Sequence, residues 1–170
     1  MALLARSGGR RETDIFEVFE QPEPDSDDRY RAVFFVHGLR HRGGEAPRRA
    51  LLLERGERLT LGPEPDNVAD AHALRVVSGD GVHLGFVPRY LCSDFNVLRS
   101  QRAPDALLRV QRLNPPPAPL QFRILCAFDS RWPVGFAPCS EPDFQPLPAP
   151  VESLVAASVA PAAGDAAFPH

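Results

Sequence analysis

The residues best suited to chemistry in this sequence are two arginines and a histidine inside a glycine-rich stretch. Arg40, His41 and Arg42 lie between Gly38 and the pair Gly43–Gly44. A guanidinium group can hold a phosphate through two parallel hydrogen bonds, and glycines let the backbone approach that phosphate closely. The imidazole ring between the arginines could stack on a base. Taken alone, the stretch fits a plain surface loop slightly better than a phosphate site.

The polar segment Asp66–His72 is the second candidate site. It precedes an apolar hairpin, and packing explains it less well than it explains the hairpin. The carboxylates of Asp66, Asp70 and Asp80 could hold a divalent ion, but turn chemistry already accounts for Asp66 and Asp80. The segment therefore stays open as a place for ligand contacts.

The sequence gives little support for a metal site or for a catalytic site. His37 and His41 are four residues apart, but they lie in an expected strand and loop, where that spacing does not converge on a zinc ion. Cys92, Cys126 and Cys139 form no C-x-x-C pair, and the first two lie in apolar runs typical of buried thiols. The sequence also lacks a G-x-S-x-G or P-loop motif. We therefore expect no cofactor, no metal and no enzymatic activity.

The charge changes sign along the chain. Residues 1–28 carry three arginines against eight acids (net −5), residues 29–131 carry 16 against ten (+6), and residues 132–170 carry four acids and no arginine (−4). All 19 cationic residues are arginine, and the formal net charge is −3. A basic centre suits a polyanionic partner, and a solvated arginine-rich surface is the alternative.

The hydrophobic pattern predicts a mainly β (α+β) domain that would position both candidates. Strands are expected at Ile15–Glu20, Tyr30–Gly38, Glu57–Gly62, Leu74–Val77, Val82–Val87, Leu107–Leu113 and Leu120–Phe128. Leu39–Gly44 is expected to be a flexible loop. Five or six strands of the core with two short inserted helices fit a small OB-like or SH3-like β-barrel.

Two helices are expected between these strands. The first covers Glu45–Glu54, with Leu51 and Leu52 facing inward. The second follows Pro88 and turns one apolar stripe toward the core. The stripe consists of Leu91, Phe95 and Leu98.

The chain is expected to divide into four parts. They are a disordered segment 1–13, a barrel domain 14–131 with its core at 30–128, a Pro-rich extension 132–150 along the surface, and a disordered Ala/Pro-rich tail 151–170. The extension carries Trp132, Phe136 and Phe144. The apolar run at the start is too short for a signal peptide, and no apolar run is long enough to span a membrane, so a soluble cytoplasmic protein is expected.

The sequence resembles the HIRAN domain family over roughly residues 30–128. Three segments carry the resemblance in this order: VHGLRHRGG (Val36–Gly44), EPDNVADAHALRV (Glu64–Val76) and GDGVHLGFVPR (Gly79–Arg89). The resemblance implies a modified OB-like β-barrel with two helices. HIRAN domains occur fused to SWI/SNF-type helicases and as short bacterial proteins, and those studied bind single-stranded DNA by capturing its free 3′ end.

By this resemblance, Arg40 would contact phosphate, Asp70 would accept a hydrogen bond from the terminal 3′-hydroxyl, and Asn67 would hold the turn that presents Asp70. The expected nucleic-acid-binding residues are Arg40, His41, Arg42, Asn67, Asp70, His72 and Arg89. The sequence departs from the family pattern at His41 and Ala69, where the family has aromatic residues. A lost stacking platform costs about 1–3 kcal/mol per base.

The sequence thus predicts a non-enzymatic module that recognises single-stranded DNA or a DNA 3′ end in a basic groove, in DNA repair or processing. The expected partners are that DNA and DNA-processing proteins, and the chain is expected to be a monomer. The alternative is a protein-interaction barrel that has lost the DNA-end pocket. An enzyme subunit or metalloprotein is the third hypothesis.

Overall fold

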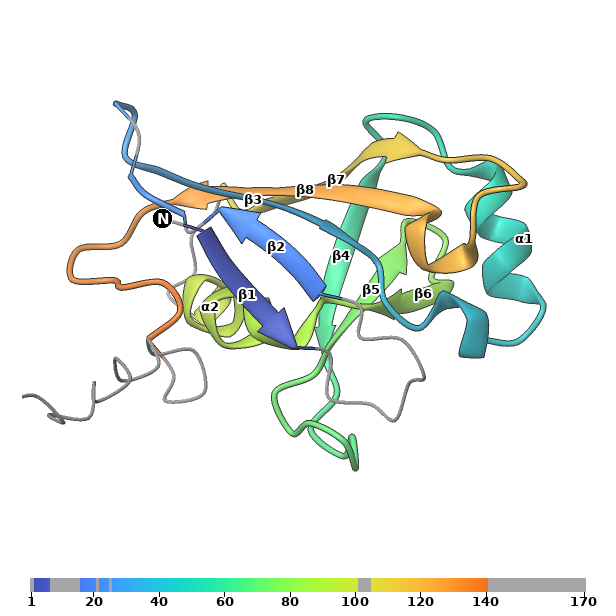
Figure 1. Cartoon of the computed structure of the whole chain (residues 1–170), viewed down its shortest axis with the longest axis horizontal. Coiled ribbons are helices and arrows are strands. Elements are labelled where there is room, and N and C mark those ends of the chain that lie inside the picture. The colour runs from blue at the N-terminus through green and yellow to red at the C-terminus, as the bar shows by residue number, and fades with distance from the viewer. Residues whose placement is uncertain (1, 7–15, 21, 25, 101–104, 141–170) are drawn as a thin grey trace, which may run out of the picture.

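A computed structural model describes residues 2–6, 16–20, 22–24, 26–100 and 105–140 of the chain (Figure 1). The strands are β1 (Ala2–Arg6), β2 (Phe16–Glu20), β3 (Arg29–Phe35), β4 (Arg58–Pro63), β5 (Leu74–Ser78), β6 (His83–Phe86), β7 (Leu107–Leu113) and β8 (Ile124–Arg131). Six of them form one antiparallel sheet in the order β3-β8-β7-β4-β5-β6, and β1 and β2 form a separate pair. The expectation of a mainly β domain is confirmed.

The two edges of the main sheet are joined by one antiparallel bridge between His37 and Phe86. The amide of each residue donates to the carbonyl of the other, over 2.9 and 2.8 Å. Gly85 makes this approach possible, since its φ is +152° and an added Cβ would lie 2.2 Å from the carbonyl oxygen of His37. The sheet therefore curls into a small barrel-like body, as the OB-like expectation required.

The core lies inside this curled sheet, against the helix α2 (Arg89–Ser100). Along β3, Tyr30 and Phe34 are buried while Arg31 points to solvent, which is the alternation of a half-buried strand. Phe95 of α2 stacks on Phe128 of β8 with the ring centroids 4.1 Å apart. The expected apolar stripe of this helix is confirmed, because its three members are all buried.

The first helix, α1 (Glu45–Leu52), differs from expectation in which face it buries. Leu51 and Leu52 are 58% and 73% exposed, so the expectation that they face inward is wrong. The buried residues are Ala46 and Ala50 of the helix and Leu53, which follows its last residue. The two alanines are spaced at i and i+4 on one face, and their small side chains let the helix lie close to β6.

Three local expectations need correction. The stretch expected as a flexible loop begins with a 3₁₀ turn, η1 (Leu39–His41), because Leu39 is buried in the core. The last expected strand starts later, since η2 (Leu120–Phe122) precedes β8. Residues 2–6 form β1, where disorder was expected. The expected tail 151–170 and Phe144 lie outside the described residues.

The segment that follows β8 folds back onto β3 and α2. Trp132 and Phe136 place their rings 5.9 and 5.7 Å from that of Tyr30. The buried carboxylate of Asp94 accepts hydrogen bonds from the Tyr30 hydroxyl (3.2 Å) and the Cys139 amide (3.0 Å). Burial, and then the Asp94 charge, raise the pKa of Tyr30 well above its usual value.

Candidate nucleic-acid interface

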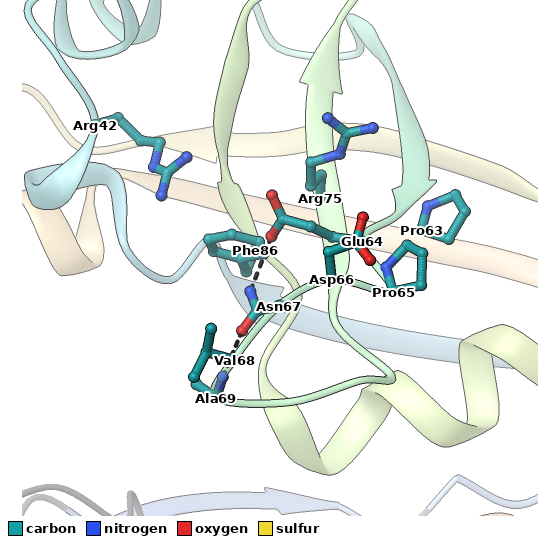
Figure 2. A pocket seen from close by; sticks show the side chains of 10 residues that line it. All are labelled: Arg42, Pro63, Glu64, Pro65, Asp66, Asn67, Val68, Ala69, Arg75 and Phe86. Carbon is teal, nitrogen blue, oxygen red and sulfur yellow. Dashed lines mark hydrogen bonds between the residues drawn. The ribbon is translucent and has the colours of Figure 1, made fainter.

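A cleft of about 610 Å³ opens where β4 ends, β5 begins and β6 ends (Figure 2). Its wall is formed by Arg42, Pro63, Glu64, Pro65, Asp66, Asn67, Val68, Ala69, Arg75 and Phe86. Arg42 comes from the segment before α1, and the continuous run 63–69 comes from the last residue of β4 and the turn that follows it. The curling of the sheet brings these two parts of the chain together.

The side chain of Asn67 braces the turn that forms one side of the cleft. Its Oδ1 accepts hydrogen bonds from the amides of Ala69 (2.9 Å) and Asp70 (3.2 Å). Its Nδ2 donates to Glu64 Oε2 over 2.8 Å. Figure 2 marks this hydrogen bond with a dashed line. An asparagine side chain that holds nearby amides in this way fixes a turn that the backbone alone would leave loose.

The other side of the cleft is an arginine held against an aromatic ring. The guanidinium of Arg42 lies 5.1 Å from the ring centroid of Phe86. Its Nη1 is 3.1 Å from His83 Nδ1, while His83 Nε2 is 3.0 Å from the carbonyl oxygen of Gly85. These contacts fit an imidazole that carries its proton on Nε2 and accepts from Arg42. Burial, and then the Arg42 charge, lower the pKa of His83.

Arg75 forms the floor between these sides. In the sheet register, Gly62 of β4, Arg75 of β5 and Phe86 of β6 are neighbours in one row. The Arg75 guanidinium lies over Gly62, within ordinary van der Waals distance (3.5 Å) of where a Cβ would be. The Nε atoms of Arg42 and Arg75 are both buried without a hydrogen-bond partner among the described residues.

The structure brings two of the expected site residues, Arg42 and Asn67, into the wall of the cleft. Arg40 and His41 lie on η1, exposed, with Arg40 Nε donating to His41 Nε2 over 2.8 Å. This turn adjoins the cleft, because an added Cβ at Gly38 would be 3.4 Å from the Phe86 ring.

The remaining expected residues lie beyond the braced turn. Asp70 is half-buried, and its Oδ1 accepts from the amide of His72 over 2.8 Å. The carbonyl of His72 accepts from Asn96 of α2, and Arg89 is the exposed first residue of that helix. The three expected residues thus lie outside the wall of the cleft; Arg89 begins α2, and His72 contacts the middle of that helix.

Sequence reasoning missed Glu64, Arg75 and Phe86 as site residues. Phe86 was assigned to the apolar hairpin, and Arg75 was passed over within a strand. The signal was available in part, because Arg75 is the one charged residue of Leu74–Ser78 and alternation places it on the outer face of the strand. The strand register that sets it beside Phe86 could not be read from the sequence.

Two kinds of feature, a membrane-spanning helix and a metal site, are absent from the described residues. No helix in the described ranges is long and apolar enough to cross a membrane. No group of three or more histidine, cysteine or acidic side chains in those ranges is arranged to hold a metal ion. The cleft instead offers two guanidinium groups, two carboxylates, an amide and an aromatic ring.

Comparison with known proteins gives one family match. The HIRAN domain profile matches residues 30–131. Among solved structures, the HIRAN domain of human HLTF aligns with a TM-score of 0.44 and 17% identity, covering 59% of this chain and 76% of that one. A structural-genomics target from Lactobacillus plantarum aligns with a TM-score of 0.44 and 19% identity, covering 61% and 99%. No curated protein matches the sequence. Since the profile covers more than half of the chain, the protein belongs to the HIRAN family, whose domains are known as nucleic-acid-binding modules.

Proposed function

We propose that this protein binds single-stranded DNA, or a DNA 3′ end, at the cleft between the braced turn and Phe86. The observation that carries the proposal is the pair of buried, unpartnered Nε groups on Arg42 and Arg75. A buried donor without an acceptor costs about 1–3 kcal/mol, and a phosphate oxygen is a strong acceptor for a guanidinium. Because both atoms are covered, the two side chains would open slightly toward a bound phosphate, whose oxygens would then complete the hydrogen bonding of both arginines.

The other groups of the cleft suit the base of the same nucleotide. The Phe86 ring, which carries Arg42 over it, offers a surface for stacking. The carboxylates of Glu64 and Asp66 can accept hydrogen bonds from base amino groups, although they repel phosphate. The mixture of charges thus favours one orientation, with phosphate at the arginines and the base edge at the acids.

End recognition is the finer part of the proposal. Asp70 is half-buried, and among the described residues its carboxylate accepts one hydrogen bond, from the His72 amide to Oδ1. Asn67 accepts from the Asp70 amide and so fixes the turn that precedes it. The second carboxylate oxygen would accept from a terminal 3′-hydroxyl. Arg40 and Arg89 would contact the next phosphates, and His41 would stack. Such a module would serve DNA repair or processing beside DNA-processing proteins, as a monomer.

The test is fluorescence anisotropy of the full chain with 5′-labelled single-stranded DNA at several salt concentrations. We expect affinity to fall with salt, with a log–log slope of about −0.7 for each phosphate contacted. The double variant R42Q/R75Q should reduce that slope by about 1.4. The control R48Q/R99Q removes the same charge from α1 and α2 and should leave the slope near that of the unmodified chain.

A salt-independent affinity, or equal losses in the two double variants, would overturn binding at the cleft. End recognition has its own comparison, between oligonucleotides with a free and a phosphorylated 3′ end. A phosphate that leaves affinity unchanged contradicts capture of the hydroxyl by Asp70 and leaves backbone binding in place.

One observation favours a second candidate function, a protein-interaction surface. Leu51 and Leu52 are neighbouring apolar side chains, both mostly exposed, on α1. A partner protein that covers them would explain why the helix presents its larger apolar residues to solvent. Under this alternative, L51S/L52S abolishes association with the partner and does not alter DNA affinity. Loss of DNA affinity in that variant would count against it.

A further inference from the structure

We propose a second phosphate-contacting surface on the outer face of β4 and β7, formed by Arg58, Arg109 and Arg112. It would continue the path of a bound single strand beyond the cleft, and the inference therefore rests on the proposed function. Its observations are separate from those of the cleft. They come from the strand register, from the placement of the acidic residues, and from exposed apolar side chains on the same face.

The register places two exposed arginines directly opposite each other. Arg58 of β4 and Arg109 of β7 are Cα partners in the antiparallel ladder, and both are exposed. Like charges at opposed positions of neighbouring strands repel and destabilise the pairing. The described ladder between these strands has Leu59 and Leu108 as its other pair, and Val110 extends the contact through backbone hydrogen bonds with Gly56 and Glu57. A polyanion bound across the two arginines would relieve the repulsion.

A β-bulge brings a third arginine to this face. Arg109 pairs with Ala127 and Arg112 pairs with Leu125, and the register shifts between Val110 and Arg112. In a regular strand, residues three apart point to opposite faces. The extra residue in β7 changes that parity, so Arg109 and Arg112 both point outward.

Neighbouring carboxylates are already paired with other cations. The pairs are Arg49 with Glu57 and Asp80, and Arg29 with Asp105 and Asp129. Within the described ranges, Arg58, Arg109 and Arg112 have no ion pair with an acid. The three charges are thus available to a ligand rather than neutralised within the fold.

Apolar side chains continue the same face beyond the arginines. One row of strand partners runs from Arg58 through Arg109 and Ala127 to Val33, and the next joins Arg112 through Leu125 to Phe35. The rings of Phe35 and Phe122 meet edge to face with centroids 5.4 Å apart, and Phe122 is 40% exposed. Arginines beside exposed aromatic rings match the needs of a single strand, whose phosphates and bases require different contacts.

The surface is continuous with the cleft along β4. Arg58 and Gly62 point to the same outer face, four residues apart, which corresponds to about 13 Å. Gly62 is the strand partner of Arg75 in the floor of the cleft. Figure 1 shows that β4 starts beside β7 and runs toward the turn between β4 and β5 that Asn67 braces. A single strand of several nucleotides could therefore contact both regions, within the roughly 4–16 nucleotides that OB-like folds cover.

The experiment compares oligo-dT of about four and about twelve nucleotides on the full chain by fluorescence anisotropy across a salt series. We expect the longer strand to bind more tightly and with a steeper salt slope. The variant R58Q/R109Q should reduce the slope for the longer strand by about 1.4, at about 0.7 per phosphate, and leave the shorter strand unaffected. Its melting temperature should equal or exceed that of the unmodified chain, because the opposed charges are gone.

The control R48Q/R99Q removes the same number of charges from the helices. With the longer strand, its salt slope should equal that of the unmodified chain. Equal slopes for R58Q/R109Q and the unmodified chain would overturn this inference and leave binding at the cleft intact. So would tighter binding of an acidic peptide than of the longer DNA strand, which would assign the face to a protein. If neither strand binds the unmodified chain, the proposed function fails together with this inference.

Discussion

Arg42 donates to an imidazole that cannot easily become charged: its Nη1 lies 3.1 Å from His83 Nδ1 while Nε2 of that ring faces the carbonyl oxygen of Gly85. The pKa of His83 is lowered from 6.5 by burial, and then by the Arg42 charge, with Arg75 acting in the same direction. Glu64 and the Gly85 carbonyl act in the opposite direction. The folded cleft thus favours the neutral form of the His83 ring.

We expect the stabilising contribution of His83 to be complete above pH 6.5 and lost as the pH falls through its lowered folded-state pKa. Protonation would remove the acceptor of Arg42 and place two cations side by side. NMR titration of the imidazole measures this pKa directly. In R42Q the pKa should rise, because the neighbouring positive charge is removed. A pKa above 6.5 in the unmodified chain would contradict the assignment.

The buried Asp94 should be a sensitive position for stability. It is 3% exposed and accepts hydrogen bonds from Tyr30 and from the amide of Cys139. Asp94→Ala would leave these buried donors without their acceptor, at a cost of about 1–3 kcal/mol in the free energy of unfolding. Urea denaturation measures this change in the free energy of unfolding. The exposed Asp66, replaced by alanine, is the control and should change stability by about 0.5 kcal/mol or less.

Closure of the sheet should depend on Gly85. A Cβ there would lie 2.2 Å from the His37 carbonyl oxygen, and the φ of +152° disfavours any side chain. Gly85→Ala should therefore lower the free energy of unfolding by at least about 1–3 kcal/mol. Gly79→Ala is the matched control in the same hairpin, because no atom lies within 4 Å of an added Cβ there. Equal melting temperatures for the two variants would show that the bridge tolerates the displacement.

The three cysteines should be unreactive in the native protein. Burial raises the pKa of Cys92 and Cys126 to about 12, and burial with the Asp94 charge raises that of Cys139 to about 11. A thiol reagent at neutral pH should label them only after denaturation.

The same cysteines give stability an alkaline limit. Their folded-state pKa values lie above the ordinary 9.0, so their contribution is complete below pH 9.0 and is lost as the pH rises toward 11–12. Melting temperatures measured across this range should fall. Cys126→Ser would remove part of that alkaline loss, and an unchanged alkaline slope in this variant would contradict the assignment to the thiols.

Local pattern was sufficient for most of the fold. The hydrophobic pattern identified β4, β5 and β7 to within a residue or two, and the stripe of Leu91, Phe95 and Leu98 identified α2. These features depend on residues that are close in the sequence, so they can be predicted without knowing which strand or helix packs against them. The prediction of which face of α1 points inward was wrong. Whether Ala50 or the exposed pair Leu51–Leu52 is buried depends on how closely the helix must approach β6.

For the site, the residue types alone pointed to the two polar segments. The role of Asn67 in holding the turn was an implication of the family resemblance, and the hydrogen bonds from the Ala69 and Asp70 amides to its side chain agree with it. Only the tertiary structure decided which side chains meet. The row of Gly62, Arg75 and Phe86 exists because of strand register, and Arg42 reaches it because the sheet closes through His37. Register and closure depend on pairing between distant strands, and no local pattern of residues specifies them.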